Sequence, residues 1–182
     1  MNDEADRLYE RLLVLRCQTG DDDAYRELVA RFGPRLQYFL LKLTGRADRA
    51  EDLAQETWVD VLRQLPRLKD AAAFTTWLYR IAHGKAMLAA RRSGREPVAT
   101  ADVEFVAEKD EEVSFSPEQA ARIHAALDRL EPNQREVLVL RFLEEMSYEE
   151  ISAVVDCPVG TVRSRIHYAK ARLQRLLASE HD

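Results

Sequence analysis

The chain has 182 residues, of which 46% are hydrophobic and 32% charged, with a formal net charge of −5, and this length suits one large or two small domains. No stretch approaches the roughly 20 uncharged apolar residues of a membrane-spanning helix, residues 1–4 are acidic where a signal peptide is basic, and the two cysteines match no metal or redox spacing. Membrane-spanning proteins, secreted disulfide scaffolds and cysteine-rich zinc modules are therefore excluded, and we expect a cytoplasmic protein with no membrane insertion.

The distribution of glycine and proline predicts an all-α protein. Six glycines and six prolines separate stretches rich in Ala, Leu, Arg and Glu, which favour helix, and no strand alternation is found. The spacing of apolar residues predicts a first helix over 5–16 and a second that starts after the acidic residues 21–23. We expect the second helix to be bent or broken at Gly33 and Pro34.

A third helix is predicted over 48–65, with an apolar side and an acidic strip opposite to it. The apolar side comprises Ala50, Leu53, Ala54, Thr57, Trp58, Val61, Leu62 and Leu65. The strip is formed by Asp52, Gln55, Glu56, Val59 and Arg63, at offsets of three, four, seven and eleven residues. The first three of these are candidate binding residues, and an ordinary solvated helix face is the alternative.

A fourth helix is predicted over 71–92, in a strongly basic part of the chain. Residues 61–95 contain eight basic residues and one acidic residue. We expect Phe74, Trp77, Leu78, Ile81 and Leu88 to be buried, and Thr75, Thr76, Arg80, His83, Lys85 and Arg91 to face outward. Aromatic residues beside basic ones can stack on unpaired bases, and Tyr79 with the loop 69–73 is the expected contact.

An acidic linker is predicted over 94–115, between domains at 1–93 and 116–182. Residues 96–120 contain eight acidic residues and one basic residue. A capping-box pattern with proline in its first turn, at residues 116–119, begins the next helix. About 22 extended residues can bridge up to ~70 Å, so the two domains could contact well-separated sites.

The second domain contains a helix-turn-helix pattern after two helices predicted over 117–130 and 133–144. Ser147 and Glu150 form a second capping box, and a short turn at 156–158 places Pro158 at the first position of the last helix. That helix has an apolar stripe, and its opposite face carries Gly160, Arg163, Ser164 and His167 with Thr161 and Tyr168 at its margins. Such a helix fits the DNA major groove, where Arg reads guanine. A helical hairpin used only for packing is the alternative.

Several stretches resemble the extracytoplasmic-function sigma factors, the compact members of the sigma-70 family. Residues 147–173 resemble region 4.2, and the run DCPVGTVRSR at 156–165 is specific to it. Residues 130–141 resemble region 4.1, residues 50–58 resemble region 2.2, and residues 74–82 resemble regions 2.3 and 2.4. The resemblance covers about 10–93 and 117–177 in the expected order.

This resemblance implies two small helical domains joined by a flexible acidic linker, and a role in promoter selection by core RNA polymerase. Asp52, Gln55 and Glu56 would dock on the β′ clamp helices, and the β flap would be a further contact of the polymerase. The minus-ten element of promoter DNA would meet Lys69, Tyr79, Arg80, His83, Lys85, Arg91 and Arg92. The minus-thirty-five element would meet Pro158, Gly160, Thr161, Arg163, Ser164, His167 and Tyr168. An anti-sigma factor is a further expected partner.

The sequence departs from many relatives at Gly84 and Leu88, where those proteins carry Asn and Asp. We expect no catalysis, cofactor or metal site, because the polymerase supplies the chemistry, the four histidines are scattered and no metalloprotease or phosphate-loop motif occurs. Two alternatives remain. One is a helix-turn-helix transcriptional regulator, which would need a receiver domain, and the other is a sigma-like interaction protein that does not open promoters.

Overall fold

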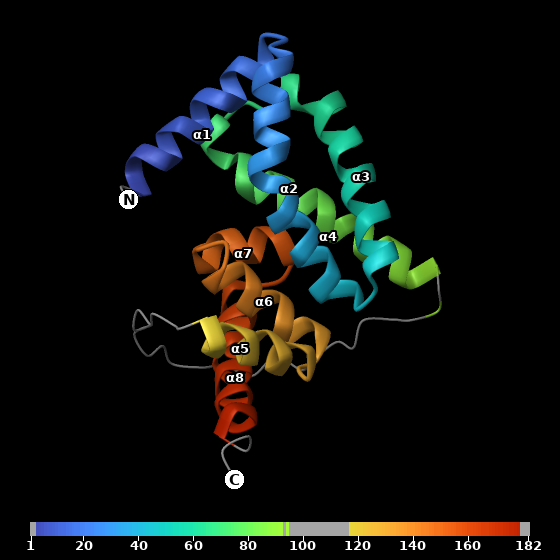
Figure 1. Ribbon diagram of the computed structural model, residues 1–182, viewed down its shortest axis with the longest axis vertical. Coiled ribbons are helices and arrows are strands. Elements are labelled where there is room, and N and C mark those ends of the chain that lie inside the picture. Colours follow the sequence, from blue (N-terminus) through green and yellow to red (C-terminus); the bar gives the residue numbers. More distant parts are fainter. Residues whose placement is uncertain (1–2, 93, 95–116, 179–182) are drawn as a thin grey trace. The chain divides into compact units, whose positions relative to one another are not determined.

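The structure is a computed structural model that describes residues 3–92, 94 and 117–178 (Figure 1). These residues form eight α-helices and two short 3-10 helices with no strand, so the all-α prediction is confirmed. The chain divides into two compact units, unit 1 at residues 1–93 and unit 2 at residues 94–182. Except for Gly94, the predicted acidic linker lies outside the described residues, as does Ser116 of the first predicted capping box.

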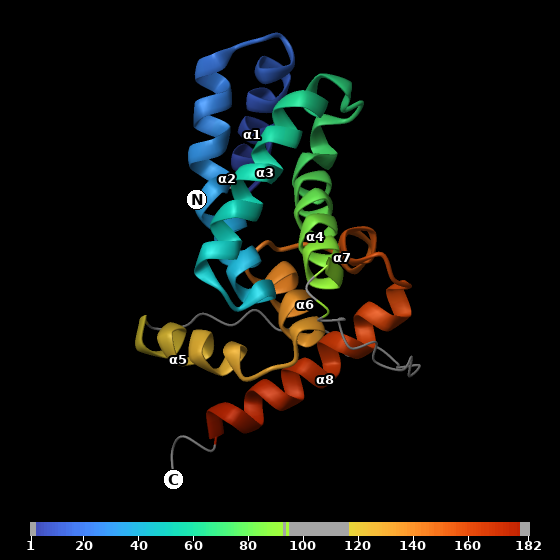
Figure 2. The same ribbon diagram turned by 90° about the vertical axis from the view of Figure 1, so that its right-hand side faces the viewer.

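Unit 1 is a bundle of four helices. They are α1 (Asp3–Gln18), α2 (Asp22–Thr44), α3 (Ala47–Gln64) and α4 (Phe74–Arg92), with 3-10 helices at Leu65–Arg67 and Ala71–Ala73. Helix α2 packs against the other three (Figure 2). Edge-to-face ring pairs join α2 to α4, with centroids 5.2 Å apart for both Phe32–Phe74 and Phe39–Tyr79. Residue numbers rise from the first pair to the second in both helices, so α2 and α4 run in the same direction.

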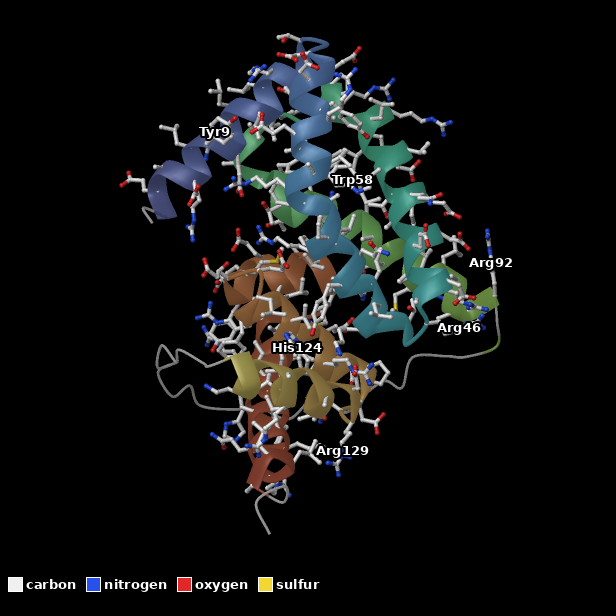
Figure 3. All side chains as sticks on the ribbon, in the orientation of Figure 1. Tyr9, Arg46, Trp58, Arg92, His124 and Arg129 are labelled. Atoms are coloured by element: carbon white, nitrogen blue, oxygen red, sulfur yellow. The ribbon has the colours of Figure 1, made fainter. Side chains whose placement is uncertain are left out.

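Residues at the two ends of α2 determine where this helix begins and ends. The Asp21 carboxylate accepts a hydrogen bond from the backbone N–H of Ala24 at 2.9 Å, and Arg16 Nη2 lies 2.7 Å from it. Gly45 ends the helix with φ 69°, a conformation that favours glycine. Trp58 of α3 reaches toward α2 (Figure 3), where the Tyr25 hydroxyl donates to its backbone carbonyl at 2.9 Å. The α2–α3 hairpin is therefore fixed at the start of α2, at its end and along its length.

Helix α2 continues through Gly33 and Pro34, so of the predicted alternatives, a bend or a break, the break does not occur. Pro34 is exposed, and the preceding glycine has no Cβ to clash with the proline ring. Buried side chains before and after this point, such as Leu28 and Leu36, lie on one continuous face. Tertiary packing along that face outweighs the one backbone hydrogen bond that proline cannot donate.

The buried side of α4 differs from the predicted one. Its buried residues are Phe74, Leu78, Tyr79, Ala82, His83 and Ala86, whereas Leu88 is 48% exposed and Trp77 and Ile81 are half-buried. The reason is that α4 packs against both α2 and α3, so the small Ala82 and Ala86 face its neighbours. Trp77, Ile81 and Leu88 lie at the edge of this buried surface.

Unit 2 is built around its last helix. It contains α5 (Pro117–Asp128), α6 (Pro132–Phe142), α7 (Tyr148–Val155) and α8 (Val159–Ala178), and the first three each pack against α8. The core includes Val137, Leu140, Ile151, Val162 and Ile166. Arg165 of α8 and Glu136 of α6 form an ion pair at 3.9 Å, with side chains 17% and 5% exposed.

Candidate functional site

The outward side of α3 is a polar surface that ends in two apolar side chains. Asp52, Gln55 and Glu56 are all exposed, as predicted. Val59 and Leu62 are 46% and 58% exposed and continue the same row at helical spacing. We call these five residues the α3 outer face. Exposed apolar side chains beside acidic ones suit docking on a partner that carries basic charge.

Leu62 was predicted to be buried, and that prediction is wrong. It follows the fully buried Val61, and one residue turns a helix by about 100°, which moves Leu62 out of the core. Its spacing of three from Val59 and seven from Gln55 places it in the polar strip, so the helical period alone could have found it.

Lys85 lies against α3 and not on the outward side of α4. Its Nζ is 2.7 Å from Asp60 and 3.6 Å from Glu56, and its side chain is 19% exposed. The expectation that it faces outward to contact the minus-ten element is therefore corrected, because two carboxylates of α3 hold the ammonium group between the helices. Lys85 thus connects α4 to one residue of the α3 outer face.

Two further residues predicted to contact the minus-ten element are buried. Tyr79 has no exposed surface, and its ring packs against Phe39, so it cannot meet an unpaired base in this structure. His83 lies one turn further on the same side and is 9% exposed. Both predictions failed because α4 is buried over a wider arc than a single-sided helix.

The remaining basic residues of this region are exposed. Arg80 and Arg91 lie on the outward side of α4 with Gly84 and Leu88, and Arg92 extends away from the end of the helix (Figure 3). Lys69 is exposed in the loop before the second 3-10 helix. We call Trp77, Arg80, Gly84, Leu88 and Arg91 the α4 outer strip.

The helix-turn-helix of unit 2 is fixed by local hydrogen bonds. The Glu150 backbone N–H donates to the Ser147 hydroxyl at 3.1 Å, and the Ser147 N–H donates to the Glu150 carboxylate at 2.8 Å, which confirms the predicted capping box. Asp156 ends α7 with φ 51°, a conformation that Asp tolerates better than most residues. The Ser152 hydroxyl donates to the Cys157 carbonyl at 2.6 Å and closes the turn. Pro158 was predicted to be the first residue of the last helix, but α8 begins one residue later, at Val159.

Helix α8 exposes most of its predicted recognition residues. Pro158, Gly160, Arg163 and Tyr168 are exposed, and His167 is half-buried with its ring edge-to-face to that of Tyr168 at 5.4 Å. Among the described residues, the Arg163 guanidinium takes part in no hydrogen bond or ion pair, so its five N–H donors can reach a ligand.

Thr161 and Ser164 do not lie open, contrary to prediction. They are 7% and 4% exposed. The Ser164 hydroxyl folds back on its own helix and donates to the Thr161 carbonyl at 3.0 Å. A short hydroxyl side chain that bonds to the preceding turn has no donor left for an outside group.

The two units match known families separately. A family model described as Sigma-70 region 2 matches residues 28–96, and one described as Sigma-70, region 4 matches residues 120–173. The RNA polymerase sigma-H factor of Pseudomonas aeruginosa is 37% identical, over 92% of this chain and 93% of its own length. The ECF RNA polymerase sigma-E factor of Escherichia coli K12 is 32% identical, over 91% of this chain and 93% of its own length. The chain belongs to the extracytoplasmic-function group of the sigma-70 family.

Two solved structures are similar to this chain in fold. CnrH, in complex with the cytosolic domain of CnrY, matches with a TM-score of 0.65 and 27% identity, over 93% of this chain and 97% of its own. RpoE from Bartonella quintana, in complex with the anti-sigma factor NepR, matches with a TM-score of 0.65 and 28% identity, over 85% and 96%.

The chain is thus an RNA polymerase sigma factor, which directs the core enzyme to promoters for transcription initiation. The alternative of a separate helix-turn-helix regulator is not favoured, because the relatives align over nearly the whole chain. Sigma factors are initiation factors and leave RNA synthesis to the polymerase.

Among residues 3–92, 94 and 117–178, no three His, Cys, Asp or Glu side chains come together in a way that could hold a metal ion. None of the helices in those ranges combines the length and the apolar character that crossing a bilayer requires.

Proposed function

We propose that this sigma factor binds core RNA polymerase and the minus-ten element through residues 1–93, and the minus-thirty-five element through residues 116–182, with residues 94–115 as the tether. The observation that carries the proposal is the exposed Arg163, on the second helix of a helix-turn-helix, with donors that no described residue uses. Arg is the residue that most often reads guanine in the major groove. Pro158, Gly160, His167 and Tyr168 complete this reading surface.

The α3 outer face is the proposed docking surface for the β′ clamp helices. Asp52, Gln55 and Glu56 supply polar and acidic groups around Val59 and Leu62. Burial of the two apolar side chains adds affinity, and the carboxylates select a partner of opposite charge. The β flap is a further proposed contact of unit 2, on the family resemblance alone.

The proposed contacts to the minus-ten element are Lys69, Arg80, Arg91 and Arg92. All four are exposed cations at or near the α4 outer strip. Neutralising DNA phosphates releases counterions, so each of these residues strengthens binding in a salt-dependent way. Within the strip, Trp77 offers an aromatic face on which a base of the melted strand can stack.

An anti-sigma factor is a proposed regulatory partner, since the sigma factor RpoE from Bartonella quintana was solved in complex with the anti-sigma factor NepR. We also propose that the chain acts in the cytoplasm, where the polymerase acts, and that it has no catalytic activity of its own.

The test is run-off transcription with purified bacterial core RNA polymerase. The template carries a promoter identified by mapping the transcript starts that appear when this chain is overexpressed. We expect transcripts only when the chain is added to the core enzyme. Arg163→Ala should lower promoter affinity by about 1–3 kcal/mol if the arginine makes a bidentate base contact.

Arg175→Ala is the matched control, because Arg175 is also exposed on α8 but lies twelve residues further along, roughly 18 Å away. It should change promoter affinity little. If the chain binds core polymerase but no transcript forms, the promoter-opening role is wrong. If Arg163→Ala leaves the footprint over the minus-thirty-five element unchanged, the assignment of that residue is wrong.

A further inference from the structure

One aromatic ring joins three helices of unit 2. The guanidinium carbon of Arg141, from α6, lies 5.4 Å from the ring centroid of Tyr148, the first residue of α7. The guanidinium carbon of Arg163, from α8, lies 5.6 Å from the same centroid. Both distances are within the range of cation–π attraction. The exposed reading residue of α8 is therefore in contact with an aromatic ring from the preceding helix.

Hydrogen bonds fix the backbone next to the Tyr148 ring and the position of Arg141. Tyr148 directly follows Ser147, whose reciprocal bonds with Glu150 hold the start of α7. Arg141 is anchored, since its Nη1 donates to the Met146 carbonyl at 3.0 Å. The ring is half-buried, and Arg141, one of its two cationic neighbours, is bonded to the backbone of unit 2.

Arg163 differs from its neighbour Arg165 on α8. Arg165 is paired with Glu136 and is largely buried, so it serves the packing of α6 on α8. Arg163 is exposed, and among the described residues its guanidinium contacts the ring of Tyr148. A ring face attracts a guanidinium without using the N–H groups at its edge. The donors of Arg163 stay available while its orientation is restricted.

We propose that Tyr148 is a positioning residue for promoter recognition, which holds the Arg163 guanidinium ready to read a base of the minus-thirty-five element. This inference rests on the proposed function of α8. A free arginine side chain loses rotamer entropy when it binds, and a ring that already restricts it reduces that loss. Tyr148 thus acts on DNA affinity through Arg163.

The test is a double-mutant cycle in the full chain, with holoenzyme binding to a duplex promoter fragment as the readout. Tyr148→Leu should weaken binding by about twofold to fivefold, the range expected for loss of one exposed cation–π contact. The same change in an Arg163→Ala background should add less than about twofold. Tyr148→Phe keeps the ring and is the matched control, with affinity within about twofold of the original.

A second measurement does not depend on DNA. In the free chain, the NMR signal of the Arg163 Nε–H proton should carry an upfield ring-current shift, present with Tyr148→Phe and absent with Tyr148→Leu. Persistence of the shift without the aromatic ring overturns the proposal. So does an equal loss of affinity from Tyr148→Leu with and without Arg163. If the ring-current result holds while no holoenzyme variant selects a promoter, the proposed function of α8 fails and the proposed orientation by Tyr148 stands.

Discussion

Helices α4 and α8 are both long and basic, and both were expected to expose residues that contact DNA. In α4, Tyr79 and His83 are buried and Lys85 is paired with carboxylates of α3. In α8, Arg163 and Tyr168 stay exposed. The difference lies in the packing, because α4 has long neighbours on two sides and α8 supports shorter helices. A helix packed on two sides leaves only a narrow strip for a ligand.

The largest expected effect comes from the buried side of α4. Tyr79→Ala should destabilise the protein by about 3–5 kcal/mol, because it empties a fully buried site against Phe39. Chemical denaturation of the full chain measures this. Trp77→Ala, on the half-buried rim of the same helix, should cost clearly less. Equal losses would show that Trp77 is packed as tightly as Tyr79 and would contradict its place in the α4 outer strip.

Within α8, the largely buried Arg165 and the exposed Arg163 test the same contrast between packing and exposure. Arg165→Ala should destabilise unit 2 by about 2–3 kcal/mol, because the carboxylate of Glu136 stays buried but loses the positive charge of Arg165. Arg163→Ala should cost less, at most about 1 kcal/mol, which is the contribution of its contact with the Tyr148 ring. Denaturation curves of both variants decide this, and a stability loss at Arg163 as large as the loss at Arg165 would contradict its assignment as an exposed reading residue.

The contrast between Lys85 and Arg91 tests which cations of α4 meet phosphate. Lys85→Met should destabilise unit 1 by about 1 kcal/mol through loss of the pair with Asp60. It should leave the salt dependence of promoter binding unchanged. Arg91→Gln should have little effect on stability but reduce the slope of log affinity against log salt by about 1. A reduced slope with Lys85→Met would restore the original sequence prediction for that residue.

The smallest expected effect concerns the start of α2. The N–H of Ala24 and the guanidinium of Arg16 hold the pKa of the Asp21 carboxyl below its usual value. A pKa that is lower in the folded state gives a stabilisation present at neutral pH and lost as pH falls through the folded pKa. Asp21→Asn should therefore lower Tm at pH 7, and the difference should shrink below about pH 4. A difference that is constant with pH would contradict this.

The sequence predicted the eight α-helices of the described residues, but not the two 3-10 helices or which side of α4 is buried. Local signals succeeded where the interactions are local, as in the reciprocal bonds of Ser147 and Glu150. The buried side of α4 was misread because Trp77 and Leu88 were placed on the buried stripe by their apolar spacing, whereas alanines fill the close contacts. The pairing of Lys85 with α3 depends on the register of two helices, which a single sequence does not contain. The contact of Arg163 with Tyr148 spans fifteen residues and is equally hidden.

Helix α7 is only eight residues long. A helix of that length is not stable in water by itself, even with a capping box, so it forms only when its apolar side meets α8. Helix α7 and helix α8, the proposed DNA-binding helix, therefore fold in one cooperative event. On heating, recognition of the upstream promoter element should vanish in step with the melting of this domain, with no intermediate that still reads DNA.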